Sequence, residues 1–454
     1  MLSSIVAKQK EYFLSQATIP VNRRVEALTS LREAVKRHEE ELYEAFYTDL
    51  GKGRAEAYMA EISVVLSEID LLRRKTASWA RPKRVRGTLG TFPSASRILR
   101  DPYGTVLILS PWNYPLLLTL SPLAGAISAG NTAIVKCSKS SPNCAGVIKN
   151  ILDDAFEEEL VCCVDPETDY ETVLWQDYDY IFFTGSPRVG RGIMERAAAD
   201  LIPVSLELGG KSPCILTDSA DLRMAARKIV WGKLLNAGQT CITVDYVAVP
   251  RDRKDELIVL MTEEIRKRYP DATHNSNYPR IINMHHFERL TKLIEGERAS
   301  GRVLGGESDP AERRIEPTIV CDADFDSEIM KEEIFGPILP IIAYDDEERM
   351  LGCIERRPHP LACYIFTQDR REAERLLKRL RFGGGCINDT IIHIANDHMP
   401  FGGVGNSGMG GYHGYYSFET FTHAKSIVTS KRTDLPIRYA PLDDNKWRFL
   451  RKVL

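Results

Sequence analysis

The chain has 454 residues, which at about 150 residues per domain is enough for two or three packed units with sizeable cores. Its 60 Lys and Arg residues nearly balance 63 Asp and Glu residues, so the chain has no overall field to hold a polyanion, and nucleic-acid binding is excluded as its main function. With 43% hydrophobic and 27% charged residues, the composition is that of a soluble globular protein and excludes disordered and fibrous classes.

The first part of the chain is predicted to be helical. Apolar residues recur at helical spacing from Val25 to Phe46, and the pattern ends at Asp49-Leu50-Gly51. A second amphipathic helix is predicted from Ile62 to Leu72. The basic segment 84–99, rich in Thr and Ser, predicts an extended arm or hairpin.

Residues 102–135 contain no charged side chain, and about 20 apolar residues are enough to cross a bilayer. Pro111, Pro115, Pro122 and several Asn and Gly residues divide this stretch into strand, loop, helix and strand. We therefore interpret it as buried core of an α/β protein and predict no membrane span.

Two series of strands alternate with helices, which is the βαβ pattern of parallel sheets. The first series has strands at 105–110, 132–136 and 180–183. The second begins near Gly209, with strands at 213–216, 244–249, 363–367 and 386–388 and helices at 252–268 and 371–380. Residues 301–317 are expected to form a surface connection between elements.

The ten cysteines follow no disulfide framework and include no CxxC pair. They indicate a reducing compartment in which most thiols are small buried hydrophobes. Lys8, Lys10 and Glu11 precede any apolar run long enough for a signal peptide. We expect a cytoplasmic protein without a metal site.

Cys241 is the one cysteine in a polar, turn-forming context, after Asn236-Ala237-Gly238-Gln239-Thr240 and before a predicted strand. A nucleophilic thiol needs access and a lowered pKa, which a loop near helix ends and backbone amides can supply. A structural thiol is the alternative at this position.

Glu207 lies between Leu206 and Leu208, directly before Gly209-Gly210. Burial of a carboxylate in apolar surroundings raises its pKa toward the range that a general base needs near neutral pH. The alternative is an edge-strand glutamate that faces water.

Two polar segments come directly after predicted strands, where ligands bind in open parallel sheets. In Pro111-Trp112-Asn113-Tyr114-Pro115, the Asn113 amide can donate to a developing oxyanion, although the segment also suits a simple turn. Phe183-Thr184-Gly185-Ser186 opens a helix whose amides suit a phosphate, but the spacing is not GxGxxG, so the usual dinucleotide fingerprint is absent.

In chain order, these segments resemble the aldehyde dehydrogenase family. The shared motifs are PWNYP at 111–115, IVKCS at 134–138, FTGS at 183–186, LELGGKSP at 206–213, GQTC at 238–241 and EEIFGP at 332–337. The run at 400–410, the segment at 412–423 and the short N-terminus are similar to the class 3 subgroup. That subgroup implies a homodimer that oxidises medium- or long-chain aliphatic or aromatic aldehydes.

The resemblance implies an α/β fold with a Rossmann-like cofactor-binding domain, an α/β catalytic domain and a small β oligomerisation arm. The expected boundaries are 1–83 and 100–207 for the cofactor-binding domain, 208–412 for the catalytic domain, 84–99 and 413–432 for the bridging arm, and 433–454 for a C-terminal tail. This basic tail is too short to span a bilayer and is expected to pack on the dimer rather than on lipid.

The resemblance also implies catalytic roles. The Cys241 thiolate adds to the aldehyde carbonyl, and the Asn113 amide and the Cys241 N–H hold the oxyanion. Glu207 then activates the water that hydrolyses the thioester. A CoA-acylating dehydrogenase is the alternative enzyme, against which Glu207 argues, and a catalytically silent relative is the alternative from another class.

The implied cofactor is NAD or NADP. Glu333 would bind the nicotinamide ribose, with Phe335 beside the nicotinamide. Lys136 would bind the adenosine ribose, and Gly185 and Ser186 the pyrophosphate. The entrance for the aldehyde is expected at Val64, Trp231 and residues 391–399.

Two segments depart from the family pattern. Lys139 stands where the family usually has the Glu of Lys-Pro-Ser-Glu, which leaves the choice between NAD and NADP open. Lys139 either faces solvent or faces the 2′-phosphate of NADP. The stretch from Glu157 to Asp169, rich in acidic residues and cysteine, has no functional interpretation from the sequence.

Overall fold

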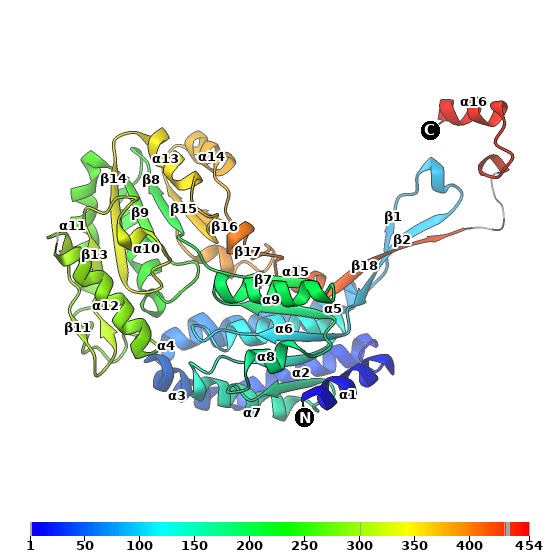
Figure 1. Cartoon of the computed structure of the whole chain (residues 1–454), viewed down its shortest axis with the longest axis horizontal. Helices are drawn as coiled ribbons and strands as arrows, with labels where there is room; N and C mark the ends of the chain where they lie inside the picture. Colours follow the sequence, from blue (N-terminus) through cyan, green and yellow to red (C-terminus); the bar gives the residue numbers. More distant parts are fainter. Residues whose placement is uncertain (1, 300, 431, 433–435, 454) are drawn as a thin grey trace.

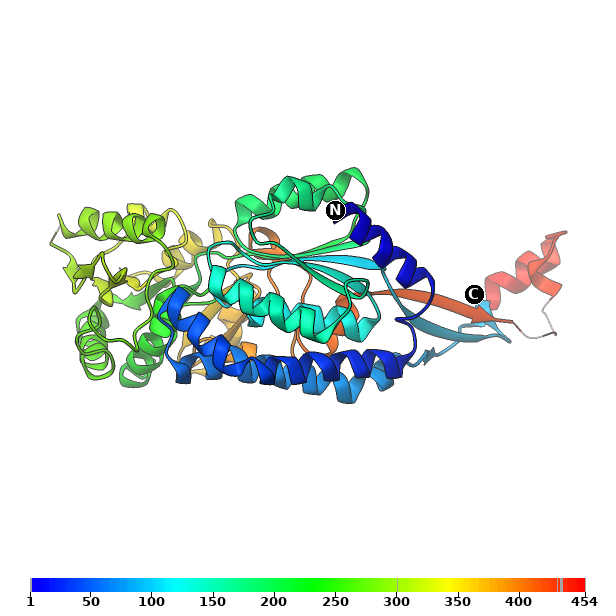
Figure 2. The same ribbon diagram turned by 90° about the horizontal axis from the view of Figure 1, so that it is seen from below.

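The structure, a computed structural model, describes residues 2–299, 301–430, 432 and 436–453. Two α/β domains lie next to each other, and a long β arm projects from one of them (Figures 1 and 2). Each domain is built on a mostly parallel sheet, which confirms the predicted α/β class.

The first domain contains a six-stranded sheet in the order β17-β7-β6-β3-β4-β5. Its strands are β3 (Thr105–Leu109), β4 (Thr132–Lys136), β5 (Val161–Val164), β6 (Tyr180–Thr184), β7 (Val204–Glu207) and β17 (Gly408–Met409). All are parallel except β17, which pairs antiparallel with β7. Every residue of β3, β4 and β6 is buried, as expected for strands covered on both faces.

Alternate side chains of this sheet belong to two cores. Val106 and Ile108 pack with α2 (Val21–Arg37), α3 (Glu39–Leu50), α5 (Ser63–Trp79), α6 (Leu117–Ala129) and α7 (Pro142–Ala155). Leu107 and Leu109 pack with α1 (Leu2–Leu14) and α9 (Pro187–Ala199) on the other face. The single helical run predicted from Val25 to Phe46 is two helices, because the backbone leaves the helix at His38.

The second domain contains a seven-stranded sheet in the order β10-β13-β14-β9-β8-β15-β16. Its strands are β8 (Pro213–Leu216), β9 (Tyr246–Pro250), β10 (Val303–Leu304), β13 (Thr318–Val320), β14 (Ile338–Tyr344), β15 (Ala362–Phe366) and β16 (Gly384–Ile387). Its helices are α10 (Leu222–Leu234), α11 (Arg251–Arg268), α12 (Met284–Arg298), α13 (Glu347–Glu355) and α14 (Arg370–Arg379). The expected surface connection at 301–317 contributes β10 to this sheet, and β11 (Ser308–Asp309) pairs there with β12 (Arg314–Ile315).

The arm is a three-stranded antiparallel sheet of β1 (Lys83–Val85), β2 (Ala95–Pro102) and β18 (Thr422–Thr429). The short helix α16 (Asp444–Val453) lies beyond the free end of β18, away from both domains (Figure 1). Residue 431 of the predicted arm and residues 433–435 and 454 of the predicted tail lie outside the described residues.

Two segments pack across the expected domain boundaries. α15 (Tyr415–Thr420), which falls in the sequence range expected for the arm, packs against α6 in the first domain. β17, in the range expected for the catalytic domain, belongs to the first sheet. Within the described ranges, no helix combines the length and apolar character that a bilayer crossing requires.

Candidate active site

A strained turn presents Cys241. Asn236, Ala237 and Gly238 all have positive φ, at 53°, 51° and 75°. Asn236 and Ala237 both carry a Cβ, and a positive φ at such residues costs conformational free energy. Proteins retain this backbone strain where the surrounding structure fixes it, often at functional sites. A Cβ on Gly238 would overlap the backbone of Gly336, so the turn also allows a close approach to the EEIFGP segment.

Gln239 holds this turn in place. Its amide nitrogen donates to the carbonyl oxygens of Asn236 and Arg280, each at 3.0 Å. Its amide oxygen accepts the N–H of Ile282 at 3.0 Å. The turn is therefore tied to the neighbouring backbone on both sides of Gln239.

The PWNYP loop, which ends at the start of α6, meets this turn directly. Asn113 Nδ2 donates to the Gln239 carbonyl oxygen at 3.1 Å, and the Tyr114 hydroxyl lies 2.7 Å from Thr240 Oγ1. Asn113 is 3% exposed. The structure thus brings the predicted oxyanion donor to the residues that precede Cys241, although the two lie more than a hundred positions apart in the sequence.

Glu207 ends β7 and is 2% exposed. Neither of its carboxylate oxygens has a hydrogen-bond partner among the residues that the structure describes. Burial raises the pKa of Glu207 well above its usual value. The alternative of an edge-strand glutamate that faces water is therefore excluded.

The Cys241 thiol is less acidic than the sequence suggested. Burial raises its pKa to about 12, and the carboxylates of Glu333 and Glu207 act in the same direction. The backbone N–H groups of Cys241 and Ile242 lower the pKa, but they do not offset burial and two nearby acids. In the chain alone, these surroundings therefore favour the neutral thiol over the thiolate.

Glu333 and Phe335 belong to the EEIFGP segment, which approaches the Cys241 turn at Gly238. A Cβ on Gly209 would overlap the Glu333 carboxylate, and Glu333 Oε1 has no partner within the described part of the chain. Burial, followed by the charge on Asp245, raises the pKa of Glu333 to about 8. Phe335 meets Trp112 edge to face at 5.4 Å.

Lys136 ends β4 and points toward the loop that follows β5. Its Nζ donates to the Pro166 carbonyl at 2.7 Å and lies 5.2 Å from the Tyr170 ring. Lys139 is largely exposed, and its Nζ lies 3.8 Å from Glu167 Oε2. The stretch from Glu157 to Asp169 thus forms β5 and a loop that contacts both lysines.

The expectation for Gly185 needs correction. Its N–H donates to the Glu207 carbonyl at 2.9 Å, so this amide is not free to bind a pyrophosphate. A Cβ at this position would overlap the Phe183 ring, which gives packing as the reason for glycine. Ser186 caps α9 by accepting the N–H of Val189 at 3.4 Å, and it remains at the helix N-terminus that suits a phosphate.

These residues fit a dinucleotide. Lys136 ends β4 and Ser186 follows β6, the two parallel strands on either side of β3, so both residues lie at the carboxyl edge of the sheet, where cofactors bind. Glu333 Oε1, for which the described residues supply no partner, is a buried acceptor of the kind that ribose hydroxyls require. Across the described residues, no group of three or more His, Cys, Asp or Glu side chains is placed to bind a metal ion.

Lys211 and Asp245 support the segment that carries Glu333, and neither was predicted from the sequence. Lys211 pairs with Asp245 and donates to the carbonyls of Ile329 and Glu332. Asp245 also accepts the N–H of Ile334 at 3.0 Å. This pair fixes the segment that carries Glu333. The sequence pointed to it only through Lys211, which lies in the LELGGKSP motif.

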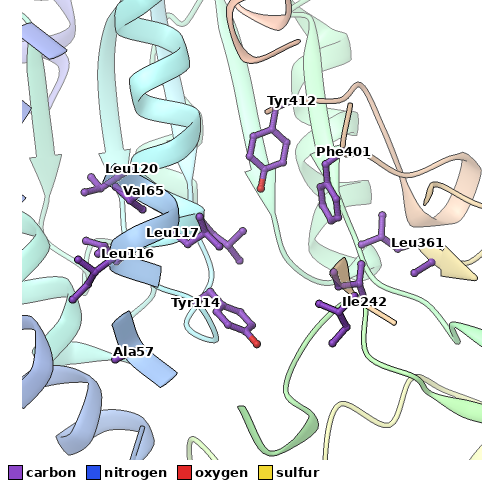
Figure 3. Packing of buried hydrophobic residues seen from close by; sticks show 14 of the residues in the cluster. Ala57, Val65, Tyr114, Leu116, Leu117, Leu120, Ile242, Leu361, Phe401 and Tyr412 are labelled. Carbon is purple, nitrogen blue, oxygen red and sulfur yellow. The ribbon is translucent and has the colours of Figure 1, made fainter. Parts of the chain in front are cut away.

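Aromatic and apolar side chains surround the Cys241 turn. Figure 3 shows Tyr114 from the loop before α6, and Tyr412 and Phe401 from the C-terminal segment, approaching Ile242 across the boundary between the domains. All four belong to one buried cluster, which Trp231 joins with a partly buried side chain. Ile391, the first residue of the expected entrance segment, has a positive φ of 62°, which is rare for a β-branched residue.

Comparison with known proteins identifies the family of the chain. The profile of the Aldehyde dehydrogenase family matches residues 2–427. The chain is 44% identical over 437 residues to the 4,4'-diaponeurosporen-aldehyde dehydrogenase of Staphylococcus aureus, covering 95% of each. It is 38% identical over 447 residues to the canine "Aldehyde dehydrogenase, dimeric NADP-preferring", covering 97% of this chain and 98% of the relative.

Solved structures lead to the same family. A substrate-bound structure of Staphylococcus aureus AldH superposes with a TM-score of 0.96 at 41% identity, covering 100% of this chain and 99% of that one. An aldehyde dehydrogenase of Mycobacterium tuberculosis complexed with NAD+ gives a TM-score of 0.84 at 25% identity, with 95% and 90% coverage. The chain therefore belongs to the aldehyde dehydrogenase family and is an NAD(P)-dependent aldehyde dehydrogenase.

Proposed function

We propose that Cys241, Asn113 and Glu207 convert an aldehyde to the free carboxylic acid in this enzyme. The observation that carries the proposal is the buried Glu207 carboxylate, which has no described partner and lies close enough to Cys241 to raise the pKa of its thiol. A buried acid without partners is costly for folding, so a role in proton transfer gives a reason for its presence.

The first half of the reaction uses Cys241 and Asn113. Cys241 Sγ releases its proton to solvent water and forms a bond to the carbonyl carbon, while the carbonyl π electrons move to the oxygen. One N–H of the Asn113 amide donates to Gln239, and the other is left to donate to this oxyanion together with the Cys241 N–H. NAD or NADP, when bound, would accept the hydride of the carbonyl carbon, and the electron pair on the oxygen then re-forms the C=O bond, which leaves a thioester on Cys241.

The second half uses Glu207. Its raised pKa suits the transfer of a proton from water near neutral pH. The activated water attacks the thioester carbonyl, the C–S bond breaks, and the acid leaves while the electron pair returns to Cys241 Sγ. This role favours hydrolysis over transfer of the acyl group to CoA.

The cofactor residues are Lys136, Ser186, Glu333 and Phe335. Lys136 would bind the adenosine ribose and Ser186 the pyrophosphate, and Glu333 would accept hydrogen bonds from the nicotinamide ribose. Lys139 would act at the adenosine ribose, where its charge is partly balanced by Glu167. We expect both NAD and NADP to be used.

The proposed substrates are medium- or long-chain aliphatic or aromatic aldehydes. The aromatic and apolar side chains around Cys241 suit an apolar chain, and one relative is named for 4,4'-diaponeurosporen-aldehyde. We also propose a cytoplasmic homodimer that pairs through the arm, since most of β18 is exposed and one relative is described as dimeric.

Mixing the enzyme with a series of aldehydes and either cofactor tests this function. Reduced cofactor and the free acid should appear without CoA, and rates should increase with apolar chain length. If reduced cofactor forms only when CoA is added, the CoA-acylating alternative is correct. If none forms with any aldehyde, the chain is a silent relative.

A further inference from the structure

A buried ion pair contacts the PWNYP loop. Lys52 Nζ lies 2.5 Å from Glu61 Oε1, and neither side chain has any exposed surface. Lys52 follows the end of α3. Glu61 belongs to η1 (Tyr58–Ile62), which lies between α4 (Arg54–Ala57) and α5.

Lys52 contacts the residues that are proposed to stabilise the oxyanion. Its Nζ also donates to the Asn113 carbonyl oxygen at 3.3 Å. The ammonium group lies 4.4 Å from the centre of the Tyr114 ring, within the range of a cation–π contact. The Lys52 ammonium group thus contacts both the backbone carbonyl of Asn113 and the ring face of Tyr114.

Glu61 holds the other end of the same loop. Its Oε2 accepts the N–H of Leu116 at 2.9 Å and that of Leu117 at 3.3 Å. These are free amides at the start of α6, where a carboxylate is favoured by the helix dipole. The ion pair therefore contacts the loop at two points, through Lys52 at Asn113 and through Glu61 at Leu116.

The same short region also reaches the turn that presents Cys241. Glu56 Oε1 accepts the N–H of Asn236 at 2.7 Å. Asn236 Nδ2 donates to the Asn113 carbonyl at 2.9 Å, so this oxygen accepts from both Asn236 and Lys52. The strained turn and the oxyanion loop are joined through one carbonyl group.

The backbone at Glu61 is unusual as well. The η1 segment is a π-helix, a conformation that is rare and occurs mostly at functional sites. It lies within an otherwise α-helical stretch, and it contributes the acid that contacts both Lys52 and the loop. A buried ion pair is often no more stabilising than apolar side chains of the same size, so stability alone does not explain it.

We propose that Lys52 and Glu61 are positioning residues for aldehyde oxidation, which fix the PWNYP loop so that the Asn113 amide already points at the oxygen that becomes negative. The proposal rests on the role of Asn113 in the proposed function. Neither side chain has exposed surface, so neither is proposed to contact the aldehyde. Preorganised donors act without reorganisation during the reaction, so a small displacement of the loop lowers the rate.

The test uses Lys52→Met and Glu61→Gln, with Glu68→Gln as a matched control. Glu68 is a buried carboxylate on α5, but it accepts from Gly414 and Ser417 instead of the PWNYP loop. We expect both variants to slow the first-turnover burst of reduced cofactor by roughly tenfold to a hundredfold. The control should stay within about twofold of the wild type in the same measurement.

Alkylation of Cys241 by iodoacetamide separates positioning from a general loss of structure. This reaction needs the thiol but forms no oxyanion, and mass spectrometry of the Cys241 peptide reports its rate. Alkylation and cofactor affinity should be unchanged in Lys52→Met and Glu61→Gln. If alkylation falls as much as the burst, the pair supports the whole site and the inference is wrong.

A double-mutant cycle with Asn113→Ala gives the decisive result. If Lys52 acts through Asn113, Lys52→Met should lose most of its effect in the Asn113→Ala background. An equal fold-change in both backgrounds contradicts the inference. If Asn113→Ala alone leaves the burst unchanged, the proposed role of Asn113 fails instead. Glu61→Gln preserves side-chain volume and gives a second cycle if Lys52→Met does not fold.

Discussion

Gly209 and Glu333 are in such close contact that no other residue fits at position 209 without moving the acid. A Cβ on Gly209 would overlap the Glu333 carboxylate, while the other side of Glu333 is fixed by the Lys211–Asp245 pair through the neighbouring backbone. The glycine therefore sets the position of the carboxylate that is proposed to bind the nicotinamide ribose.

Gly209→Ala should weaken cofactor binding, because the added methyl group displaces Glu333. We expect the Kd for NAD and NADP to rise by about tenfold, as for loss of a hydrogen bond to a charged group. Titration of protein fluorescence measures this directly. Gly192→Ala is the control, since a Cβ on Gly192 meets nothing within 4 Å. Equal Kd values for both variants would show that Glu333 does not bind the cofactor.

Cys241→Ser should abolish aldehyde oxidation while leaving cofactor affinity nearly intact. A serine hydroxyl without a strong base is a far weaker nucleophile than a thiolate. Steady-state assays and a cofactor titration on the same sample measure the two properties. More than a few per cent of the wild-type activity would rule out Cys241 as the nucleophile.

The raised pKa of Cys241 predicts how its alkylation depends on pH. Because burial and two acids raise the pKa to about 12, the thiolate is a small fraction of the thiol at neutral pH. The rate of reaction with iodoacetamide in the absence of cofactor should therefore increase about tenfold per pH unit between about pH 7 and pH 10. A plateau near pH 8 would show that the thiol has an ordinary or lowered pKa.

The Glu207→Gln variant keeps the volume of the side chain but removes the base. If Glu207 serves deacylation, a fast burst of about one equivalent of reduced cofactor per site should precede a slow steady state. In the wild type, the raised pKa means that the deprotonated base, and with it the steady-state rate, increases with pH. Equal loss of burst and steady state would place Glu207 in acylation or in structure.

The sequence was sufficient for most of the fold. Buried strands such as β3 and β4 are short, uninterrupted apolar runs with glycine and proline between them, and local patterns of that kind predict a parallel sheet. The break between α2 and α3 at His38 was not predicted, because the apolar spacing continues across it. The position of β17 beside β7 was also missed, since no local pattern records a pairing between such distant residues.

The site was predicted only in part. Motifs that resemble a known family indicated Cys241, Asn113 and Glu207, but they carry no information about ionisation. The thiol pKa depends on burial and on two distant carboxylates. Lys52 and Glu61 were missed because a charged residue between glycines, or on a helical segment, normally faces solvent, and their burial follows from packing of distant segments.

One of the two expected departures from the family pattern concerns cofactor choice. Lys139 replaces an acid that would repel the 2′-phosphate of NADP, and Glu167 lies 3.8 Å from the lysine charge. Both side chains are largely exposed, so each should change the preference between NADP and NAD only modestly. The two residues should therefore shift the preference in opposite directions.

Lys139→Glu should lower kcat/KM for NADP relative to NAD by roughly five- to tenfold, because it places a negative charge where the 2′-phosphate would bind. Glu167→Gln should raise the same ratio, because it frees Lys139 from its partner. Both effects should weaken at high salt, since ions screen exposed charges. Lys378→Glu, an exposed charge reversal on α14, controls for the change in net charge. If neither variant changes the ratio at low ionic strength, Lys139 faces solvent and other residues select the cofactor.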